Sequence, residues 1–369
     1  MKSLKFKTVV IGGGPSGANA AKYLASSNED VLLIEKDLKF DKPCGGGLFL
    51  KAFDEFDIPK TVITKVVNTI DIVSPKLKKV SVDISKHPLA IVHRQEFDKT
   101  LRDLAVEAGA KLIKAKVVNI STKNEGVRIL ARQLDGTEIT INAKYAIVAD
   151  GVNSSARVQL LGEHPNRVLT YYANLKDTTS SSCQFWFGDD ISPKHYAWIF
   201  PHYNGVNIGL VANNKHKMKE FYNNFFKKTQ IGGTIPKPKG YFIPHWKRMT
   251  LYKDNVFYVG DSASLVLPFT YEGIYYALKS GKLAAQAIIK NNPSEYEKSW
   301  NSLYLKKFKF LRTLQTIFLQ NNWWIDRMVR LYQHPKFQTA VIEYWSGSRE
   351  PASLFKTLYK IVRSLIKYS

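Results

Sequence analysis

The chain has few of the features that mark secreted, metal-binding or membrane-spanning proteins. Its 2 cysteines, Cys44 and Cys183, are far apart and give neither a disulfide framework nor a metal-ligand spacing. No apolar run reaches the roughly 18 residues that a membrane-spanning helix needs, and no cleavable signal precedes the first expected strand. Internal repeats and low-complexity segments are absent as well. A reducing, cytoplasmic compartment is therefore expected.

Acidic residues are also scarce. The 369 residues include 31 Asp and Glu against 54 Lys and Arg, a formal net charge of +23. Such a charge favours anionic partners. Nucleic acid is not expected, because the basic residues are spread along the chain and no nucleic-acid-binding motif is present. An anionic membrane surface is the expected partner instead, which would place the protein peripherally on the inner face of the cell membrane.

The end of the chain favours the same hypothesis. Apolar side chains fall on one face of an expected helix and basic side chains lie off that face, as in helices that bind membrane surfaces. The apolar set is Leu354, Phe355, Leu358, Ile361, Val362, Leu365 and Ile366, and the basic set is Lys356, Lys360, Arg363 and Lys367. Upstream, residues of interfacial type are Trp323, Trp324, Arg327, Met328 and Arg330. The alternative is a helix that docks on its own protein.

A glycine motif lies between two short β-branched runs near the start of the chain. Residues 7–11 and 31–34 are typical of buried parallel strands. Gly12 allows a tight turn, Gly14 lets the backbone approach a pyrophosphate, and Gly17 lets the next helix pack on the first strand. That helix offers free N–H groups and a positive dipole end to phosphates. Glu35 ends the second strand, where a carboxylate accepts from ribose hydroxyls.

Two later segments complete a pattern. Residues 145–149 form an expected strand that ends at Asp150-Gly151, and residues 256–259 lead into Gly260-Asp261. Pro268 then turns the chain, and Gly273-Ile274 begins a helix. An ordinary Asp-Gly turn would explain the first of these segments taken alone.

Together the three segments resemble the FAD-dependent oxidoreductases built like p-hydroxybenzoate hydroxylase. The resemblance implies FAD, with Asp261 accepting from the ribityl hydroxyls and the helix at Gly273 pointing its N-terminus at the flavin N1/O2 edge. It also implies that Arg94 contacts the pyrophosphate and that the backbone of Val117 holds adenine. The cofactor-binding residues expected are Gly12, Gly14, Ser16, Gly17, Glu35, Lys36, Cys44, Gly45, Arg94, Val117, Asp150, Gly151, Gly260, Asp261, Pro268, Gly273 and Ile274.

Two further motifs narrow the resemblance. Residues 42–48 read Lys-Pro-Cys-Gly-Gly-Gly-Leu and residues 196–201 read Tyr-Ala-Trp-Ile-Phe-Pro. Both are similar to motifs of the geranylgeranyl reductase family, whose members hydrogenate isoprenoid double bonds. The family usually has a lysine where this chain has His202, and often a small residue where it has Tyr271. These departures bear on substrate identity more than on reaction class.

The resemblance also suggests roles in the chemistry. Consecutive glycines let a loop pass against a flat isoalloxazine, so Cys44, Gly45 and Gly46 are the expected catalytic segment, with the Cys44 thiol as a candidate proton donor. Alternating aromatic residues face one side of a strand and suit an apolar chain. The expected substrate-binding residues are Tyr196, Trp198, Phe200, His202 and Tyr271.

The expected fold class is α/β, in three parts. A discontinuous Rossmann-like FAD-binding domain takes residues 1–70, 91–165 and 250–295. An α+β substrate domain with an antiparallel sheet takes 71–90 and 166–249. A helical region with the basic amphipathic tail takes 296–369, with breaks near Pro335 and Gly347.

The function that these observations favour is reduction of C=C bonds in geranylgeranyl chains of membrane lipids or related prenyl compounds, by hydride transfer from flavin N5. A monooxygenase or epoxidase acting on an apolar substrate is the second hypothesis, and a non-catalytic membrane-associated flavoprotein is the third. The electron donor is left open between NAD(P)H and ferredoxin. A nicotinamide would dock without its own Rossmann domain, because a second glycine motif is absent.

Overall fold

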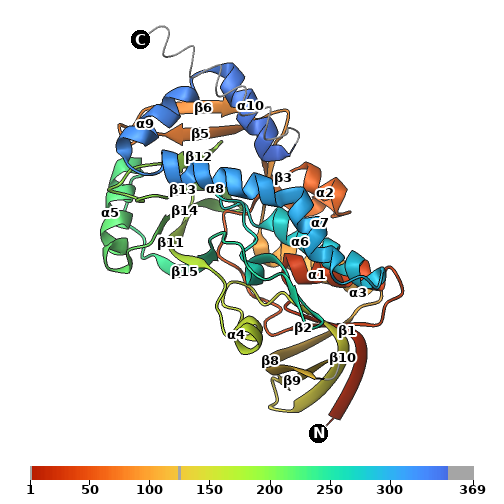
Figure 1. The fold of residues 1–369 in the computed structure, drawn as a ribbon. Helices are drawn as coiled ribbons and strands as arrows, with labels where there is room; N and C mark the ends of the chain where they lie inside the picture. Colours follow the sequence, from red (N-terminus) through yellow and green to blue (C-terminus); the bar gives the residue numbers. More distant parts are fainter. Residues whose placement is uncertain (1, 124–125, 348–369) are drawn as a thin grey trace.

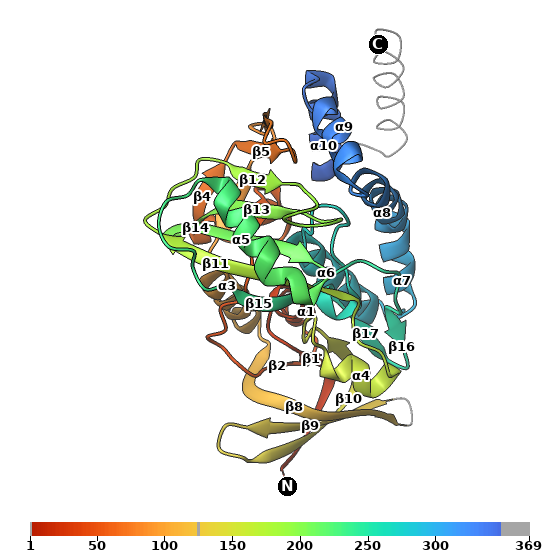
Figure 2. The same ribbon diagram turned by 90° about the vertical axis from the view of Figure 1, so that its left-hand side faces the viewer.

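The computed structural model describes residues 2–123 and 126–347. Within these ranges the strands form two seven-stranded sheets and one three-stranded sheet. Figures 1 and 2 both show the first large sheet at the N-terminal end of the molecule and the second at the opposite end. The amphipathic tail expected over residues 354–367 lies outside the described residues.

The first sheet combines parallel and antiparallel pairs. Its strands are β1 (Lys2–Ile11), β2 (Val31–Glu35), β8 (Lys111–Lys123), β9 (Gly126–Gln133), β10 (Glu138–Val148), β17 (Val256–Tyr258) and β16 (Tyr252–Lys253). Strand β1 pairs in parallel with both β2 and β10, and β10 pairs in parallel with β17. The carboxyl ends of β1, β2, β10 and β17, which carry the three sequence motifs, therefore meet at one edge of the sheet.

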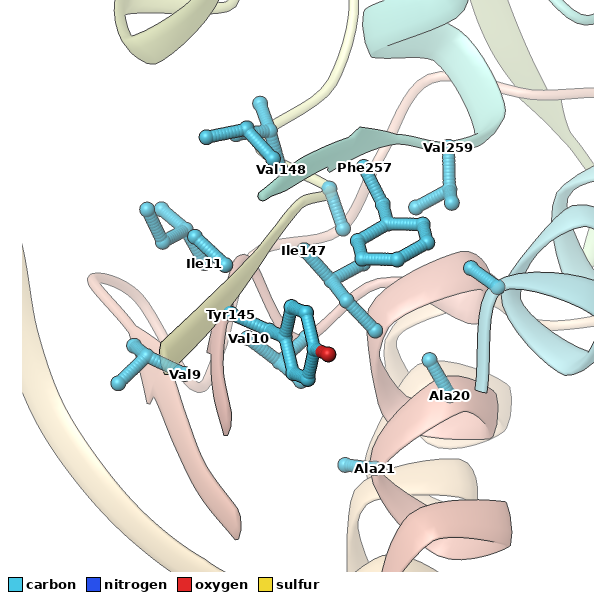
Figure 3. Close-up of a cluster of buried hydrophobic side chains, with 14 of the residues drawn as sticks. Val9, Val10, Ile11, Ala20, Ala21, Tyr145, Ile147, Val148, Phe257 and Val259 are labelled. Atoms are coloured by element: carbon cyan, nitrogen blue, oxygen red, sulfur yellow. The ribbon is translucent and has the colours of Figure 1, made fainter. Parts of the chain in front are cut away.

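Helices cover the apolar faces of this sheet. They are α1 (Pro15–Ala25), α3 (Arg94–Glu107) and α6 (Ile274–Ile289). Figure 3 shows Ala20 and Ala21 of α1 in one cluster with side chains of β1, β10 and β17, among them Ile147 and Phe257. The small side chains of α1 let it approach closely, and a Cβ at Gly281 of α6 would stand 2.1 Å from the backbone oxygen of Ser16. The dinucleotide-type turn is thus held by tight packing on both sides.

The second sheet is rich in aromatic residues, and it shares no strand with the first. Its strands, in order, are β15 (Lys239–Pro244), β11 (Arg167–Lys176), β14 (Gly205–Ala212), β13 (Ala197–His202), β12 (Cys183–Trp186), β5 (Thr69–Val73) and β6 (Lys79–Asp83). All neighbours are antiparallel except β12 and β5, which run parallel. One face packs on α5 (Met218–Thr229) through Phe221, Tyr222 and Phe225. The sheet, which the sequence predicts to be antiparallel, therefore contains one parallel pair of strands.

Shorter elements connect the large sheets. The third sheet consists of β3 (Gly47–Phe49), β7 (Leu89–Val92) and β4 (Ile63–Val67). The remaining short helices are α2 (Lys51–Glu55), α4 (Ser155–Leu161) and the 3-10 turns η1 (Lys60–Val62), η2 (Lys215–Lys217) and η3 (Gly260–Ala263). Strand β3 follows directly on the segment of consecutive glycines, so this small sheet fixes the end of that loop.

After residue 294 the described chain is helical. The elements are α7 (Glu295–Trp300), the π-helical turn η4 (Asn301–Leu305), α8 (Lys306–Phe318), α9 (Asn322–Leu331) and α10 (Pro335–Ser346). Figure 2 shows them along one side of the molecule, from the first sheet to the far end of the second. Pro335 begins α10 and Gly347, with φ of +81°, ends it, as expected. A third break was not anticipated: the Asn321 side chain accepts hydrogen bonds from the N–H groups of Trp323 and Trp324 and starts α9.

The expected fold class is confirmed by this arrangement. Strands β5 and β6 join the second sheet, in line with the assignment of residues 71–90 to the substrate domain, while β7 belongs to the small third sheet. The exact domain limits stay a prediction. None of the helices within the described ranges has the length and apolar character required to cross a membrane.

Candidate active site

A cavity of about 540 Å³ lies between the two large sheets, and all three sequence motifs line it. This volume is within the range of ligand and cofactor sites. The expected site residues along its wall are Gly12, Gly14, Ser16, Glu35, Lys36, Cys44, Gly45, Gly46, Arg94, Val117, Asp150, Gly151, Tyr196, Trp198, Phe200, Asp261, Tyr271, Gly273 and Ile274. The expected residues Gly17, Gly260, Pro268 and His202 are not part of that wall. Segments separated by more than two hundred residues therefore converge on one space.

The glycine turn after β1 is sterically required. Gly12 has φ of +103°, and a Cβ there would stand 2.3 Å from the backbone oxygen of Ala149. A Cβ at Gly17 would stand 1.9 Å from the backbone oxygen of Gly12, so Gly17 acts by packing and not by contact with the cavity. Gly260 has a similar packing role, because a Cβ there would meet Ser16 Oγ at 2.7 Å. Side chains at these positions would separate α1 and the third motif from the sheet.

Glu35 stabilises the turn and borders the cavity. Its Oε2 accepts a hydrogen bond of 2.6 Å from the N–H of Gly13, and its Oε1 accepts one of 2.8 Å from the N–H of Asp37. Arg102, for which the sequence motifs predict no role, donates hydrogen bonds to the backbone oxygens of Gly13 and Leu38. The backbone around the expected ribose position is thus fixed from two sides.

Arg94 stands in a buried ion pair at the start of α3. Its Nε and Nη2 donate to the two carboxylate oxygens of Asp98 at 3.1 and 2.8 Å. Burial opposes the charge, but Asp98 and the neighbouring Cys44 side chain raise the pKa of Arg94 well above its usual value. The Sγ of Cys44 also accepts a hydrogen bond of 3.3 Å from the N–H of Gly46. Cys44 therefore lies between a guanidinium group and a backbone donor.

The loop that carries Cys44 is tied to the third motif. The Lys42 ammonium group forms an ion pair with the carboxylate of Asp261 at the edge of the cavity. Burial works against the lysine charge, but the attraction of Asp261 outweighs it and raises the pKa of Lys42. The sequence motif around Lys42 does not predict this role, because its partner lies 219 positions away in the chain.

Three alternating aromatic residues, two in β13 and one directly before it, face the cavity, as their alternation predicts. Tyr196, Trp198 and Phe200 all line it. Tyr196 donates its hydroxyl hydrogen to the backbone oxygen of Thr270 at 2.6 Å. Trp198 Nε1 donates to Asn207 Oδ1 at 2.6 Å, and Asn207 donates in turn to Asn174 Oδ1 at 2.6 Å. Hydrogen bonds to neighbouring elements therefore hold two of these rings in one orientation.

One sequence-based interpretation of this region needs correction. His202 lies outside the cavity wall: its Nδ1 is 3.0 Å from Asn204 Oδ1, and its ring stacks near Tyr203. The alternation continues through β13, but the strand has passed the cavity by that residue. The freedom of Gly45 also has a protein cause, because a Cβ there would meet the Phe200 ring at 2.4 Å. The glycine loop is thus packed directly on the aromatic wall.

Tyr271 anchors a buried polar cluster behind the cavity. Its hydroxyl lies 2.7 Å from His195 Nδ1 and 2.8 Å from His245 Nδ1. A hydroxyl has one hydrogen, so it donates to one imidazole and accepts from the other. Burial lowers the pKa of His195 to about 3 and that of His245 to about 4, with neighbouring positive groups adding to the effect. Both rings are therefore neutral at pH 7.

A second cavity, of about 100 Å³, adjoins the first. The two share four wall residues: Phe185, Tyr196, Thr270 and Trp345. The second cavity lies between the second sheet and helices α8, α9 and α10, and its wall is almost entirely apolar, with Ile72, Leu314, Phe318, Met328 and Ile342 among its residues. No sequence motif predicts this second cavity, because helices from the last fifth of the described chain form about half of its wall.

Comparison with known proteins places this architecture. The sequence pattern of the geranylgeranyl reductase catalytic domain matches residues 166–239, and that of pyridine nucleotide-disulphide oxidoreductases matches residues 6–183. The geranylgeranyl diphosphate reductase of Synechocystis sp. is 30% identical over 356 residues, covering 86% of this chain and 86% of the relative. The chain belongs to the geranylgeranyl reductase family.

Further likenesses agree with this membership. The digeranylgeranylglycerophospholipid reductase of Methanococcus aeolicus is 30% identical over 344 residues, covering 84% of this chain and 87% of the relative. A solved structure of a geranylgeranyl bacteriochlorophyll reductase-like protein from Thermoplasma acidophilum has a TM-score of 0.81 at 25% identity, covering 89% of this chain and 92% of that one. The chain is an FAD-dependent oxidoreductase, so the expected enzyme class and the expected FAD cofactor are confirmed.

The residues along the cavity fit FAD. A Cβ at Gly14 would have no atom within 4 Å, so the start of α1 is open to an incoming pyrophosphate. Asp150 Oδ2 accepts from the N–H of Ala156, whereas the buried Oδ1 has no hydrogen-bond partner within the described residues. Burial raises the pKa of Asp150. Gly273 begins α6 at the cavity, which directs a helix N-terminus toward the expected flavin position.

Proposed function

We propose that this protein reduces C=C bonds in geranylgeranyl chains of membrane lipids or related prenyl compounds. The observation that carries the proposal is the apolar cavity that adjoins the FAD-type cavity through Phe185, Tyr196 and Trp345. Such a pair of spaces suits a long apolar substrate whose reactive part lies beside the cofactor. The names of the relatives from Synechocystis sp. and Methanococcus aeolicus support this substrate class.

Each part of the site has a task in such a reaction. FAD, when bound and reduced, supplies a hydride. The aromatic wall formed by Tyr196, Trp198 and Phe200 excludes water and holds the apolar chain. An isolated trisubstituted alkene accepts hydride poorly, so a protein group must hold a proton close to the second carbon. The pyrophosphate and ribityl groups of the cofactor would be held by the start of α1 and by Asp261.

Cys44 remains a hypothesis for that proton-donating group. Its sulfur lines the cavity beside Gly45 and Gly46, and accepts from the N–H of Gly46. Replacement by serine keeps the size and a weak donor but removes the thiol. If the Cys44 thiol supplies the proton, Cys44→Ser slows alkene reduction and leaves the FAD absorbance spectrum unchanged. A variant with full activity and an unaltered spectrum would reject this role.

The first experiment is an anaerobic single turnover. Purified protein is reduced with dithionite and mixed with a geranylgeranyl lipid, and flavin absorbance and product mass are followed. Reoxidation of the flavin with a gain of two hydrogens per double bond is the expected result. A flavin that stays reduced until oxygen enters, followed by oxygen in the product, would favour the monooxygenase hypothesis. Retained FAD with no turnover on any lipid would favour the non-catalytic one.

The electron donor is tested in the same assay without dithionite. NADH, NADPH and reduced ferredoxin are offered in turn to the oxidised protein, and the rate of flavin reduction is measured for each. We propose that the flavin is reduced either by a nicotinamide, NADH or NADPH, or by reduced ferredoxin.

We also propose that the protein binds anionic membrane surfaces peripherally. The net charge of +23 supports this, as does Trp323 of α9, which is 53% exposed with the Arg327 guanidinium group stacked 3.1 Å from its ring centroid. The test is cosedimentation with vesicles that contain or lack anionic lipid, using the full chain and a variant without residues 351–369. Equal binding by the two proteins would reject the tail as an anchor.

A further inference from the structure

Glu272 lies in the wall of the larger cavity, next to a residue that also borders the smaller one. Glu272 immediately precedes Gly273, the first residue of the α6 N-terminus, and it lines the larger cavity. Its Oε2 accepts a hydrogen bond of 3.0 Å from Nε1 of Trp345, a residue that lines both cavities. An apolar chain that extends from the smaller cavity into the larger one therefore passes this carboxyl group on its way to the cofactor.

Two lysines stand behind the same carboxyl group. The Lys307 ammonium group of α8 donates to the backbone oxygen of Trp345 at 3.1 Å, and Lys51 of α2 donates to the backbone oxygen of Ser346. Both exert an attraction on the Glu272 carboxylate. Two tyrosine hydroxyls, of Tyr276 and Tyr304, also interact electrostatically with it. The carboxyl group thus has the larger cavity on one side and basic groups on the other.

The balance of these surroundings leaves the group titratable near neutrality. Burial raises the pKa of Glu272 to about 7, against the opposing effects of Lys307, the Trp345 hydrogen bond and Lys51. Burial in turn lowers the pKa of Lys307 to about 8, although Glu272 opposes that shift. A general acid works best when its pKa is close to the pH at which it operates. Glu272 meets this requirement where an exposed carboxylate would not.

We propose that Glu272 is the catalytic residue that protonates the alkene. This inference rests on the proposed reductase function and names the proton donor that the function requires. Oε2 accepts from Trp345, so Oε1 carries the proton. In the reaction the O–H bond at Oε1 breaks, the π electron pair of the alkene forms a C–H bond at the less substituted carbon, and the other carbon receives the hydride supplied by the reduced cofactor. The C=C bond becomes a C–C bond with two new C–H bonds.

The carboxylate left at Glu272 is stabilised by its setting. The α6 N-terminus and the hydrogen bond from Trp345 both favour negative charge there. Lys307 interacts electrostatically with Glu272, and its lowered pKa makes it a suitable group to return a proton. Proton uptake from solvent then restores the lysine before the next double bond is reduced.

The test compares Glu272→Gln with a matched control, Glu220→Gln, whose exposed side chain on α5 is remote from both cavities. Glutamine keeps the shape and can accept from Trp345 but has no acidic proton. In the anaerobic single turnover, Glu272→Gln should lower the rate of product formation by roughly 10²- to 10⁴-fold, while Glu220→Gln matches the parent protein. FAD content and absorbance should stay the same in all three proteins.

A readout independent of turnover is the infrared signal of a protonated carboxyl group. In the FAD-loaded parent protein, the C=O band should disappear as the pH rises through about 7, and Glu272→Gln should lack that change. The turnover rate should fall over the same pH window, because the proton donor is lost. Lys307→Met should move both transitions to higher pH, since Lys307 lowers the pKa of Glu272. A purely structural role of Glu272 predicts no shift in the pH dependence of the turnover rate.

The outcomes separate this inference from the proposed function. If the parent protein reduces no prenyl lipid, the proposed function fails and the assignment of Glu272 fails with it. If the parent reduces the lipid and Glu272→Gln does so at the same rate, only the assignment is overturned. An equal loss in Cys44→Ser but none in Glu272→Gln would instead assign the proton to the thiol.

Discussion

The two large sheets contribute to the active site in different ways. The first supplies backbone: glycine turns, helix N-termini and a few carboxylates at the ends of parallel strands. The second supplies side chains: an aromatic wall in which Tyr196 donates a hydrogen bond to Thr270 and Trp198 donates one to Asn207. The first kind of surface depends on short sequence motifs. The second depends also on partners that meet only after the chain has folded.

The largest effect should come from adding a side chain at Gly17, in the part of the site that the first sheet builds from backbone. A Cβ there would stand 1.9 Å from the Gly12 oxygen, so Gly17→Ala must displace α1 or the turn. We expect loss of bound FAD after purification and a large loss of soluble protein, measured by flavin absorbance and thermal unfolding. Gly232→Ala is the control, because a Cβ at Gly232 meets no atom within 4 Å. Normal FAD content in Gly17→Ala would contradict the steric argument.

The contact between the two surfaces is the next target. A Cβ at Gly45 would meet the Phe200 ring at 2.4 Å, so Gly45→Ala should rotate that ring or shift the loop, at a cost of about 1–3 kcal/mol. We expect a lower denaturation midpoint and a perturbed flavin spectrum. In Gly47→Ala the added methyl would have its nearest neighbour, Ile91 Cδ1, at 3.9 Å, so both quantities should change little. Equal effects at the two glycines would refute the assigned contact.

The histidines behind the second surface should govern acid stability. The pKa of His245 is about 4 in the folded protein against 6.5 for an ordinary histidine. Its contribution is therefore fully present above pH 6.5 and is lost as the pH falls toward 4, by about 2 kcal/mol at pH 5. His245→Gln should flatten the decline of the melting temperature between pH 7 and pH 5. Parallel curves for parent and variant would count against a buried neutral imidazole.

The smallest effect should come from the hydrogen-bond chain that holds Trp198. Asn207→Ala removes the acceptor of the indole N–H and the donor to Asn174. We expect a loss of about 1–2 kcal/mol in the free energy of unfolding, because buried polar groups are left without partners, and a higher KM for the prenyl substrate with FAD binding unchanged. Asn204→Ala, at an exposed position, should show neither change.

Sequence patterns predicted in detail the part of the site that the first sheet supplies. They predicted the part that the second sheet supplies only incompletely. The strands, turns and helix around Gly12, Asp150 and Asp261 lie where their motifs indicate, because each motif specifies a local backbone shape. The aromatic alternation of β13 correctly indicated a shared face. It could not indicate where the cavity ends, so His202 was included although it lies beyond the wall.

The sequence by itself determined the class of fold, the FAD-type turn and the shared face of Trp198 and Phe200, since these depend on neighbours within a few residues. Only the tertiary structure decided which distant groups meet. Lys42 pairs with Asp261, Gly45 packs on Phe200, and Trp345 donates to Glu272. Each of these contacts joins residues at least 70 positions apart. Burial then sets the pKa of Glu272, and burial is a property of the packed chain and not of any segment within it.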